Sequence, residues 1–353
     1  MVLKKFKQAT LMSLKTAGVA RAVQNSRWRR RRLLILAYHG ISLDDEHEWN
    51  YTQYMPAAVL RSRLEQLRNT RSNVLPLNEA IERLYQNDLP QRAVTITFDD
   101  GTADFYQKAF PLLQEFAMPA TLYLTTFYSH YNRPVFDIMC SYLLWKGRHS
   151  QLELRGLTGE VGTLNLGSAN GRETARVAIL GFARNQRFSA EDKDALLAKV
   201  AAHIDVNYET LVARRIMQNL TPEEVTELSA AGIDVQLHTH RHRTPKDRAL
   251  FMREIEENRK SIQGMTGKPA AHFCYPSGEY DPMFLPWLKE SGIVSATTCE
   301  PGFASISDDR LLLPRVLDNP ALSPIEFESW LSGVSAALPR RALNGKNSGG
   351  RLG

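Results

Sequence analysis

Short apolar runs alternate with amphipathic stretches along most of this chain. The apolar runs have the length of buried strands, whereas the stretches between them repeat their apolar residues at helical spacing. The predicted strands are residues 33–38, 93–98, 120–126, 233–237, 272–275, 293–298 and 311–317. The predicted helices are residues 57–68, 77–85, 103–116, 221–232, 246–265, 281–291 and 324–331. This alternation predicts a largely parallel sheet with helices outside, and about seven strands favour an incomplete or distorted (β/α) barrel over an open sheet.

Residues 127–220 interrupt the alternation between two predicted strands. The segment contains a Gly-rich polar patch at 156–171 and three predicted helices. Long insertions in barrels tend to lie on the loops around the active site. We therefore expect a barrel over residues 33–335 that carries a largely helical lid or subdomain at its mouth.

Positive charge is concentrated at the two ends of the chain. Residues 1–32 contain four Lys, six Arg and no acidic residue, and residues 336–353 contain three Arg and one Lys. The remaining body has 30 basic and 38 acidic residues. A nucleic-acid-binding protein carries its positive charge on the folded face that docks, so the pattern excludes nucleic acid as a partner.

The basic leader, residues 1–32, precedes an apolar run that ends at Tyr38. That run is too short for the core of a signal peptide or for a transmembrane helix, so it predicts the first barrel strand. We expect the leader to be a solvated arm or a weak contact to anionic lipid. The protein is then expected in the cytoplasm or at the cytoplasmic face of the inner membrane, in an oligomeric state that we leave open. The tail, residues 336–353, is expected to be disordered.

Candidate chemistry lies directly after two of the predicted strands. Asp99 and Asp100 follow the strand that ends at Phe98, and His238 and His242 follow the one that ends at Leu237. Either pair alone is also typical of an ordinary loop, but the loops that follow barrel strands meet at one rim. Asp100 and the two histidines make a ligand set that suits Zn²⁺, with Co²⁺, Ni²⁺ or Mn²⁺ as alternatives, and leaves positions open for water and substrate. The set predicts a metal-dependent hydrolase.

The second carboxylate of the pair, Asp99, is predicted to be the general base that takes a proton from the attacking water. An amine leaving group also needs a general acid. His39, which directly follows the first strand, is our candidate, because His272 begins a strand and should lie at the opposite end of the barrel. His130 and His47 are the other candidates.

Three motifs resemble those of the polysaccharide deacetylase family, also known as the NodB-homology family and as carbohydrate esterase family four. Thr97–Gly101 reads TFDDG, His238–His242 fits H-[ST]-x-x-H, and Phe273–Gly278 fits a third motif in part. The resemblance implies a distorted (β/α)7 barrel, a divalent metal ion and removal of N-acetyl groups from an amino-sugar polymer. It also supports the roles given above to the two aspartates and the two histidines. The backbone N–H of Tyr275 is then expected to hold the oxyanion, with Pro276 and Gly278 beside the substrate.

The chain departs from the family pattern in two places. Many members have in the third motif an Arg that orients the base, and here Cys274 occupies that position. Arg315 is a candidate replacement from another strand, with a surface ion pair as the alternative. Many members also have a C-terminal Leu-x-His motif, but no histidine follows His272. The placement of His39 resembles rearranged members that deacetylate poly-N-acetylglucosamine.

The leading hypothesis is therefore a deacetylase of amino sugars in an exopolysaccharide, a lipopolysaccharide or a lipid-linked glycan precursor. One alternative is an O-acetyl esterase or small-amide hydrolase that uses the same site. The other is a non-catalytic carbohydrate-binding member of a polysaccharide biosynthesis complex. Four aromatic residues in predicted loops are candidates for stacking on sugar rings: Trp49, Tyr51, Tyr128 and Tyr131.

Overall fold

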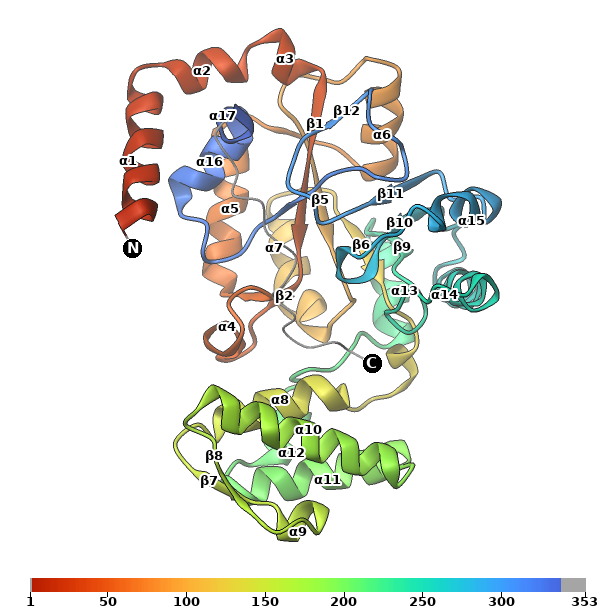
Figure 1. Ribbon diagram of the computed structural model, residues 1–353. Coiled ribbons are helices and arrows are strands. Elements are labelled where there is room, and N and C mark those ends of the chain that lie inside the picture. Colours follow the sequence, from red (N-terminus) through yellow and green to blue (C-terminus); the bar gives the residue numbers. More distant parts are fainter. Residues whose placement is uncertain (1, 338–353) are drawn as a thin grey trace.

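The computed structural model describes residues 2–337, and its main body is a curled parallel sheet covered by helices (Figure 1). The strands around the barrel pair in the order β1, β5, β6, β9, β10 and β11, and β13 pairs with the other side of β1. Their bounds are β1 (Arg32–Tyr38), β5 (Ala93–Phe98), β6 (Thr121–Leu124), β9 (Asp234–Leu237), β10 (His272–Cys274), β11 (Ser295–Thr297) and β13 (Val316–Leu317).

The last strand closes the barrel between β11 and β1. Val316 pairs in parallel with Leu36 of β1, and Leu313, three residues earlier, forms a parallel bridge with Thr297 of β11. Short strands extend the sheet at two points: β4 (Asn73–Val74) beside β5, and β12 (Ala304–Ser305) antiparallel to β1. The predicted distorted (β/α)7 barrel is confirmed.

Helices cover the outside of the sheet, and most begin and end close to their predicted bounds. The start of the helix after Thr221 has the clearest local cause. The Thr221 side chain accepts a hydrogen bond from the N–H of Glu224, and the Glu224 side chain accepts one from the N–H of Thr221. The predicted helix 103–116 is divided into a π-helical turn followed by an α-helix. The helices are α5 (Ala57–Asn69), α6 (Leu77–Tyr85), η1 (Phe105–Ala109), α7 (Phe110–Glu115), α13 (Pro222–Ala230), α14 (Arg248–Thr266), α15 (Phe284–Glu290) and α16 (Pro324–Ser332).

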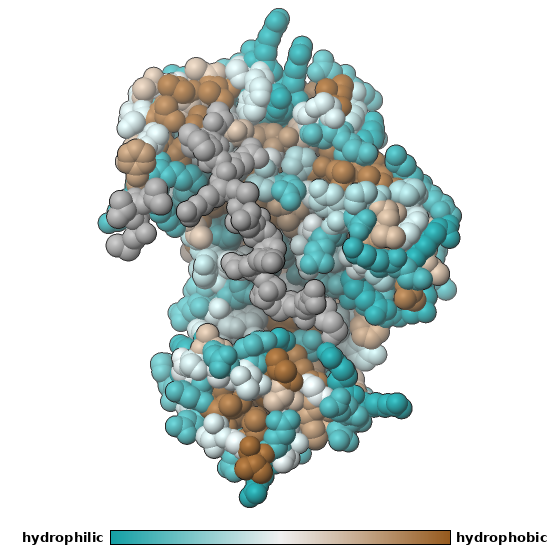
Figure 2. Space-filling view, in the orientation of Figure 1, coloured by the Kyte–Doolittle hydropathy of each residue, from teal (hydrophilic) through white to brown (hydrophobic). Residues whose placement is uncertain are grey.

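The insertion is a separate lobe next to the ends of the barrel strands (Figures 1 and 2). It has a hydrophobic core of its own, with Leu143, Leu152, Ile179 and Val200 fully buried. It is largely helical, as expected, but it also contains a two-stranded antiparallel sheet that the sequence pattern did not reveal. Its elements are α8 (Phe136–Lys146), β7 (Gln151–Glu153), α9 (Arg155–Thr158), β8 (Thr163–Asn165), α10 (Ala169–Asn185), α11 (Ala190–His203) and α12 (Tyr208–Ala213).

The basic leader differs from the solvated arm that we expected. It forms α1 (Val2–Thr16), α2 (Val19–Gln24) and α3 (Arg27–Arg30), and the first two contact α16. Arg29 is fully buried, and its guanidinium donates to the carbonyl oxygens of Leu331 (3.2 Å), Arg32 (2.7 Å) and Ala93 (3.1 Å). One arginine of the basic run therefore holds the leader to the barrel by satisfying buried carbonyl groups.

Two further expectations concern the ends of the chain. Within residues 2–337, none of the helices has both the length and the apolar character required to cross a bilayer. The final helix, α17 (Val334–Ala337), includes the first two residues of the expected tail. The rest of the tail, residues 338–353, lies outside the described residues.

Candidate active site

Two loops at the same rim of the barrel carry the aspartates and the histidine pair. After β5 the chain turns sharply at Gly101, where φ is 79° and a Cβ would lie 2.2 Å from Leu124 Cδ1, so a larger residue does not fit. Non-glycine residues with left-handed backbone occur in both loops: Asp100 (φ 74°), Thr239 (φ 63°) and His242 (φ 55°). Such conformations are costly and persist at functional sites where the surroundings hold them.

The first group of side chains, which we call the Asp100 cluster, consists of Asp100, His238 and His242. Asp100 Oδ1 lies 3.3 Å from His238 Nε2 and 3.2 Å from His242 Nε2. His238 Nδ1 is 2.8 Å from the carbonyl oxygen of Cys274, to which it donates, so Nε2 presents its lone pair to the cluster. Zinc bonds of about 2.0–2.2 Å place tetrahedral ligand atoms about 3.3–3.5 Å apart.

The surroundings of the Asp100 cluster also fit a cation. Asp100 Oδ1 is buried and has no hydrogen-bond partner among the described residues. Burial alone would raise the pKa of Asp100, but the two imidazoles lower it well below its usual range, so the carboxyl group is ionised. An anionic oxygen and two imidazole nitrogens that converge in this way can hold a divalent metal ion.

A buried asparagine on α14 fixes the start of the histidine loop. The N–H of His238 donates to Asn258 Oδ1 at 3.0 Å. Asn258 Nδ2 donates in turn to the carbonyl oxygen of Leu124 and to Thr126 Oγ1, both at 2.9 Å. The sequence did not identify Asn258, because one amide within a long charged helix carries no local signal of this role.

The second group, which we call the Asp99 cluster, consists of Asp99, Arg315, Cys274 and His39. Arg315 Nη1 and Nη2 donate to the two carboxylate oxygens of Asp99 at 2.8 and 2.7 Å, and both residues are buried. Arg315 is itself held by the carbonyl oxygen of Thr298 (3.0 Å) and by Thr97 Oγ1 (3.2 Å). Of the two readings of Arg315, the structure therefore supports the partner of Asp99 over the surface ion pair.

Arg315 also sets the charge of the Asp99 carboxyl group. Burial raises the pKa of Asp99, but the bidentate guanidinium outweighs it and lowers the pKa to about 2. Asp99 is therefore a carboxylate near neutral pH, which a general base requires.

Cys274 lies beside both the Asp99 carboxylate and the Arg315 guanidinium. Its Sγ lies 3.0 Å from Arg315 Nη2 and 3.5 Å from Asp99 Oδ2. Asp99, His238 and Cys274 are also close enough to form a second possible ligand set. The guanidinium already places a positive charge against two of those three groups, so a cation is disfavoured there. Of the two possible ligand sets, the Asp100 cluster is therefore the better fit to a cation.

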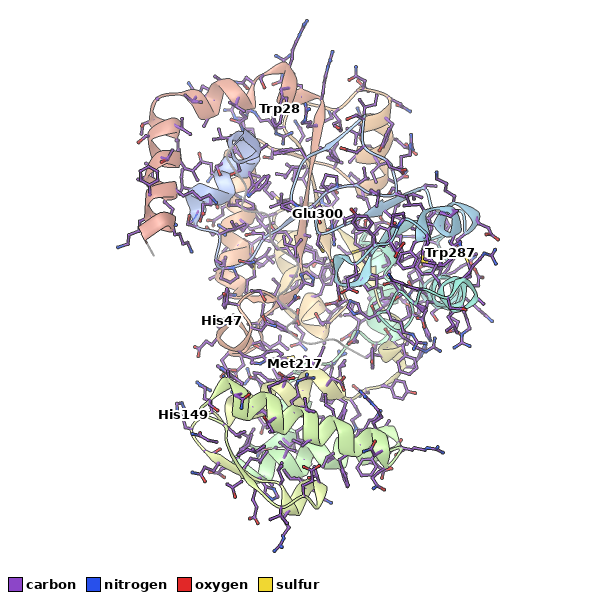
Figure 3. The ribbon with its side chains drawn as sticks, in the orientation of Figure 1. Trp28, His47, His149, Met217, Trp287 and Glu300 are labelled. Carbon is purple, nitrogen blue, oxygen red and sulfur yellow. The ribbon has the colours of Figure 1, made fainter. Side chains whose placement is uncertain are left out.

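His39 is the histidine candidate that lies beside the base. Its Nε2 is 3.8 Å from Asp99 Oδ2, and 16% of its side chain is exposed. His272 begins β10 and hydrogen-bonds Ser295 Oγ at 2.8 Å, at the opposite end of the strand, as expected. His47, labelled in Figure 3, contacts Ser42 Oγ at 3.1 Å.

The N–H of Tyr275, the expected oxyanion donor, donates to the carbonyl oxygen of Thr297 at 3.2 Å, because the pairing of β10 with β11 continues past Cys274. The role of this N–H toward an oxyanion stays a prediction. Pro276 and Gly278 form a tight turn in which a Cβ on Gly278 would lie 2.6 Å from Cys299 Cβ. Their contact with substrate stays a prediction.

Comparison with known proteins identifies the family. The polysaccharide deacetylase family model matches residues 86–146 and 195–296, and the gap between these ranges falls within the insertion. YxkH of Bacillus subtilis (strain 168), which bears the name of a polysaccharide deacetylase, is 21% identical over 309 residues, covering 86% of this chain and 77% of YxkH.

Solved structures support the fold. The deacetylase PplD of Streptococcus pyogenes, solved with acetate, superposes with a TM-score of 0.55 at 20% identity over 84% of this chain and 96% of PplD. IcaB from Ammonifex degensii gives 0.53 at 18% identity over 85% and 97%. A de-N-acetylase from Aggregatibacter actinomycetemcomitans gives 0.54 at 17% identity over 85% and 99%. The family match and the relative, together with this shared fold, show that the chain belongs to the polysaccharide deacetylase family, whose members are hydrolytic enzymes.

Proposed function

We propose that this protein is a metal-dependent deacetylase that removes N-acetyl groups from amino sugars. Its substrate is an exopolysaccharide, a lipopolysaccharide or a lipid-linked glycan precursor. The observation that carries the proposal is the separation of Asp99 and Asp100 into two clusters, one built to hold a cation and the other to hold a charged base. The likeness to IcaB and to the Aggregatibacter de-N-acetylase supports action on amino sugars.

Asp100, His238 and His242 would hold the metal ion, with Zn²⁺ the first candidate for an O/N₂ ligand set and Co²⁺, Ni²⁺ or Mn²⁺ the alternatives. When bound, a divalent cation supplies Lewis-acid chemistry, because it lowers the pKa of water and polarises a carbonyl group. Asp100 and the two imidazoles do not need to move for this role, since hydrogen bonds to the backbone and to Asn258 already orient His238.

Asp99 would take the proton from the attacking water molecule. The bidentate contact with Arg315 fixes the plane of its carboxylate and keeps it ionised at neutral pH. His39, 3.8 Å from Asp99 Oδ2, would donate a proton to the departing amine nitrogen. The base and the acid thus lie next to each other, on the loops that follow β5 and β1.

The alternative of a non-catalytic binding protein drew its support from two residues missing from the family pattern. Arg315 now lies where an arginine is needed to orient the base, although it comes from a different strand. His39 lies beside the same carboxylate, where an acid is needed. A protein that only binds carbohydrate has no use for this buried and charged arrangement.

Acetate release from oligomers of N-acetylglucosamine, with β-1,4 and β-1,6 linkages, tests the proposed function. We expect the purified protein to release acetate, to lose this activity with a chelator, and to regain it on addition of Zn²⁺, Co²⁺, Ni²⁺ or Mn²⁺. Release that persists at full rate in the chelator would contradict metal dependence. Metal-loaded protein that releases acetate only from O-acetylated sugars would favour the esterase alternative.

A further inference from the structure

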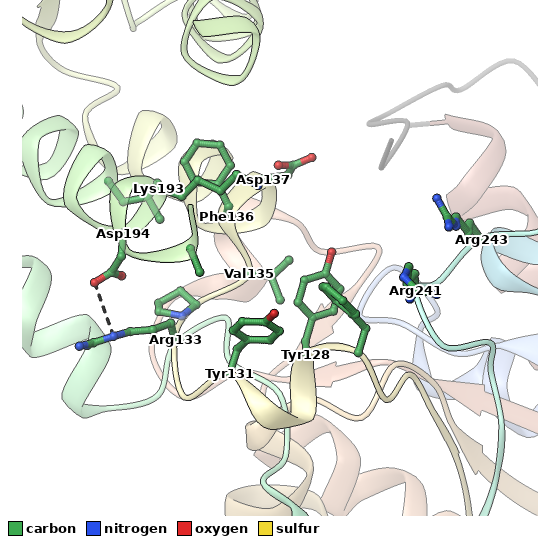
Figure 4. Close-up of a pocket in the computed structure, with 14 residues that line it drawn as sticks. Tyr128, Tyr131, Arg133, Val135, Phe136, Asp137, Lys193, Asp194, Arg241 and Arg243 are labelled. Carbon is green, nitrogen blue, oxygen red and sulfur yellow. Dashed lines mark ion pairs between the residues drawn. The ribbon is translucent and has the colours of Figure 1, made fainter. Parts of the chain in front are cut away.

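A cavity of about 550 Å³ lies between the insertion and the barrel (Figure 4). Most of the lining comes from the insertion and includes Tyr131, Phe136 and Lys193, and the barrel side is formed by Arg241 and Arg243. The volume falls in the range of about 300–1,000 Å³ that is typical of pockets for small organic ligands. None of the roles assigned above to the two aspartate clusters uses this space.

The lining combines flat aromatic surfaces with a few charged groups. Tyr128, Tyr131 and Phe136 face the cavity, and Lys193 lies beside them on α11 (Figure 4). Tyr131 is 42% exposed, so one face of its ring is free to contact a ligand. Pyranose rings fit such a lining. Their C–H faces pack on aromatic rings, and their oxygens accept hydrogen bonds from cationic side chains.

Two arginines on the barrel side are held in place from behind. Arg241 Nη1 is 3.1 Å from Glu254 Oε1, and Arg243 Nε is 2.8 Å from the same oxygen. Arg241 also pairs with Glu257 at 2.5 Å. Glu254 is buried, so this network orders the two guanidinium groups before any ligand arrives.

The cavity adjoins the metal-binding loop through the chain itself. Arg241 and Arg243 are the sequence neighbours of His242, and consecutive Cα atoms are about 3.8 Å apart. The two sides are also joined, because the N–H of Phe127 donates to the carbonyl oxygen of His240 at 2.8 Å. The barrel side of the cavity is therefore formed by the same loop that carries the two histidines of the Asp100 cluster.

We propose that this cavity is a second sugar-binding subsite, which holds a hexose or hexosamine unit of the same glycan whose acetamide group lies at the Asp100 cluster. The inference rests on the proposed function and extends it. The substrate is then an oligomer or polymer rather than a single amino sugar or a small amide. The insertion supplies the recognition of chain length, and the barrel supplies the chemistry.

The test compares N-acetylglucosamine dimers and hexamers as substrates of the wild type and of Tyr131→Ala. We expect the wild-type KM to be about tenfold lower for the hexamer than for the dimer, and Tyr131→Ala to raise the hexamer KM and so remove most of that difference. The matched control is Phe6→Ala, which removes an aromatic ring that is 72% exposed on the leader helix α1 and lies outside the cavity lining. The control should keep the wild-type dependence on length.

Direct binding separates this inference from the proposed function. Hexamer titration followed by calorimetry requires no turnover, so it reports on the cavity even if no acetate is released. Weaker hexamer binding by Tyr131→Ala and by Lys193→Gln, but not by Phe6→Ala, would support the subsite. Equal hexamer affinity in all four proteins, or a wild-type KM that does not change with length, would overturn it.

Discussion

Asp99 and Asp100 are neighbours in the chain, yet they lie in two contrasting regions of the rim. The Asp99 cluster is closed, because a buried arginine binds both carboxylate oxygens and a thiol fills the remaining space. The Asp100 cluster is open, since its Oδ1 faces two imidazole nitrogens and lacks a hydrogen-bond donor among the residues described. The same side chain can thus be prepared for proton transfer or for metal binding, depending on the positive group placed against it.

The difference depends on which kind of positive charge each region can accept. Arg315 places a permanent positive charge against Asp99. A metal ion at Asp99 would be repelled by this charge, so its binding there is unfavourable. His238 and His242 instead place imidazole nitrogens 3.3 and 3.2 Å from Asp100, so the three side chains can share a metal ion. Each prediction below removes one part of this arrangement.

The largest expected effect comes from His238→Ala. This change removes one of three ligands, so bound metal should be lost and acetate release should fall by at least about 10⁴-fold. Asp99→Asn is the matched variant, which should keep the metal while losing about 10²–10⁴-fold in kcat. Metal analysis of both purified proteins checks the pair, and loss of metal in Asp99→Asn would reverse the two assignments.

A smaller effect is expected for His39→Ala, and it should depend on the leaving group. An amine must be protonated as the C–N bond breaks, so acetate release from N-acetyl sugars should drop by about 10²-fold. An alkoxide leaves more readily, so release from an O-acetylated sugar should change by less than about threefold. Equal losses on both substrates would show that His39 does not act as the acid.

The smallest effect is expected for Arg315→Lys, which keeps the charge but loses the bidentate geometry. We expect kcat/KM to fall by about 10–100-fold with metal content unchanged. The pKa of Asp99, now about 2, should rise, because the variant keeps the attraction of a positive charge but loses the bidentate hydrogen bonds that also oppose the effect of burial. The acidic limb of the pH profile of kcat/KM should therefore move to higher pH. A limb that stays in place would show that Arg315 does not control the base, and thermal unfolding would check that the variant folds.

The sequence predicted most of the barrel, because buried parallel strands and their covering helices have strong periodic signals. The bounds of β5 and α6 agree with the prediction at both ends. The helical leader was missed for a different reason. Basic residues usually indicate a solvated segment, and the burial of Arg29 depends on carbonyl oxygens of Leu331 and Ala93, which are far away in the chain.

In the site, too, the sequence predicted residues that belong to a local motif and missed contacts between distant parts of the chain. The two motifs that fix Asp99, Asp100, His238 and His242 are local, so their spacing was sufficient to bring them together. The hydrogen bond from the N–H of Tyr275 to Thr297 was not predicted, because no local pattern reveals strand pairing. The cavity itself was not predicted, although Tyr128 and Tyr131 were candidates for sugar stacking, since its lining combines residues that are far apart in the chain.

The position of Arg315 on the last barrel strand has a consequence for synthesis and degradation of the chain. A nascent or clipped polypeptide that stops before residue 315 would already contain every metal ligand, but its base would lack the guanidinium that keeps it ionised in a buried place. Hydrolytic competence would then arise only when the C-terminal segment closes the ring of strands. Incomplete copies of the protein would contain the proposed metal ligands without being able to remove acetyl groups.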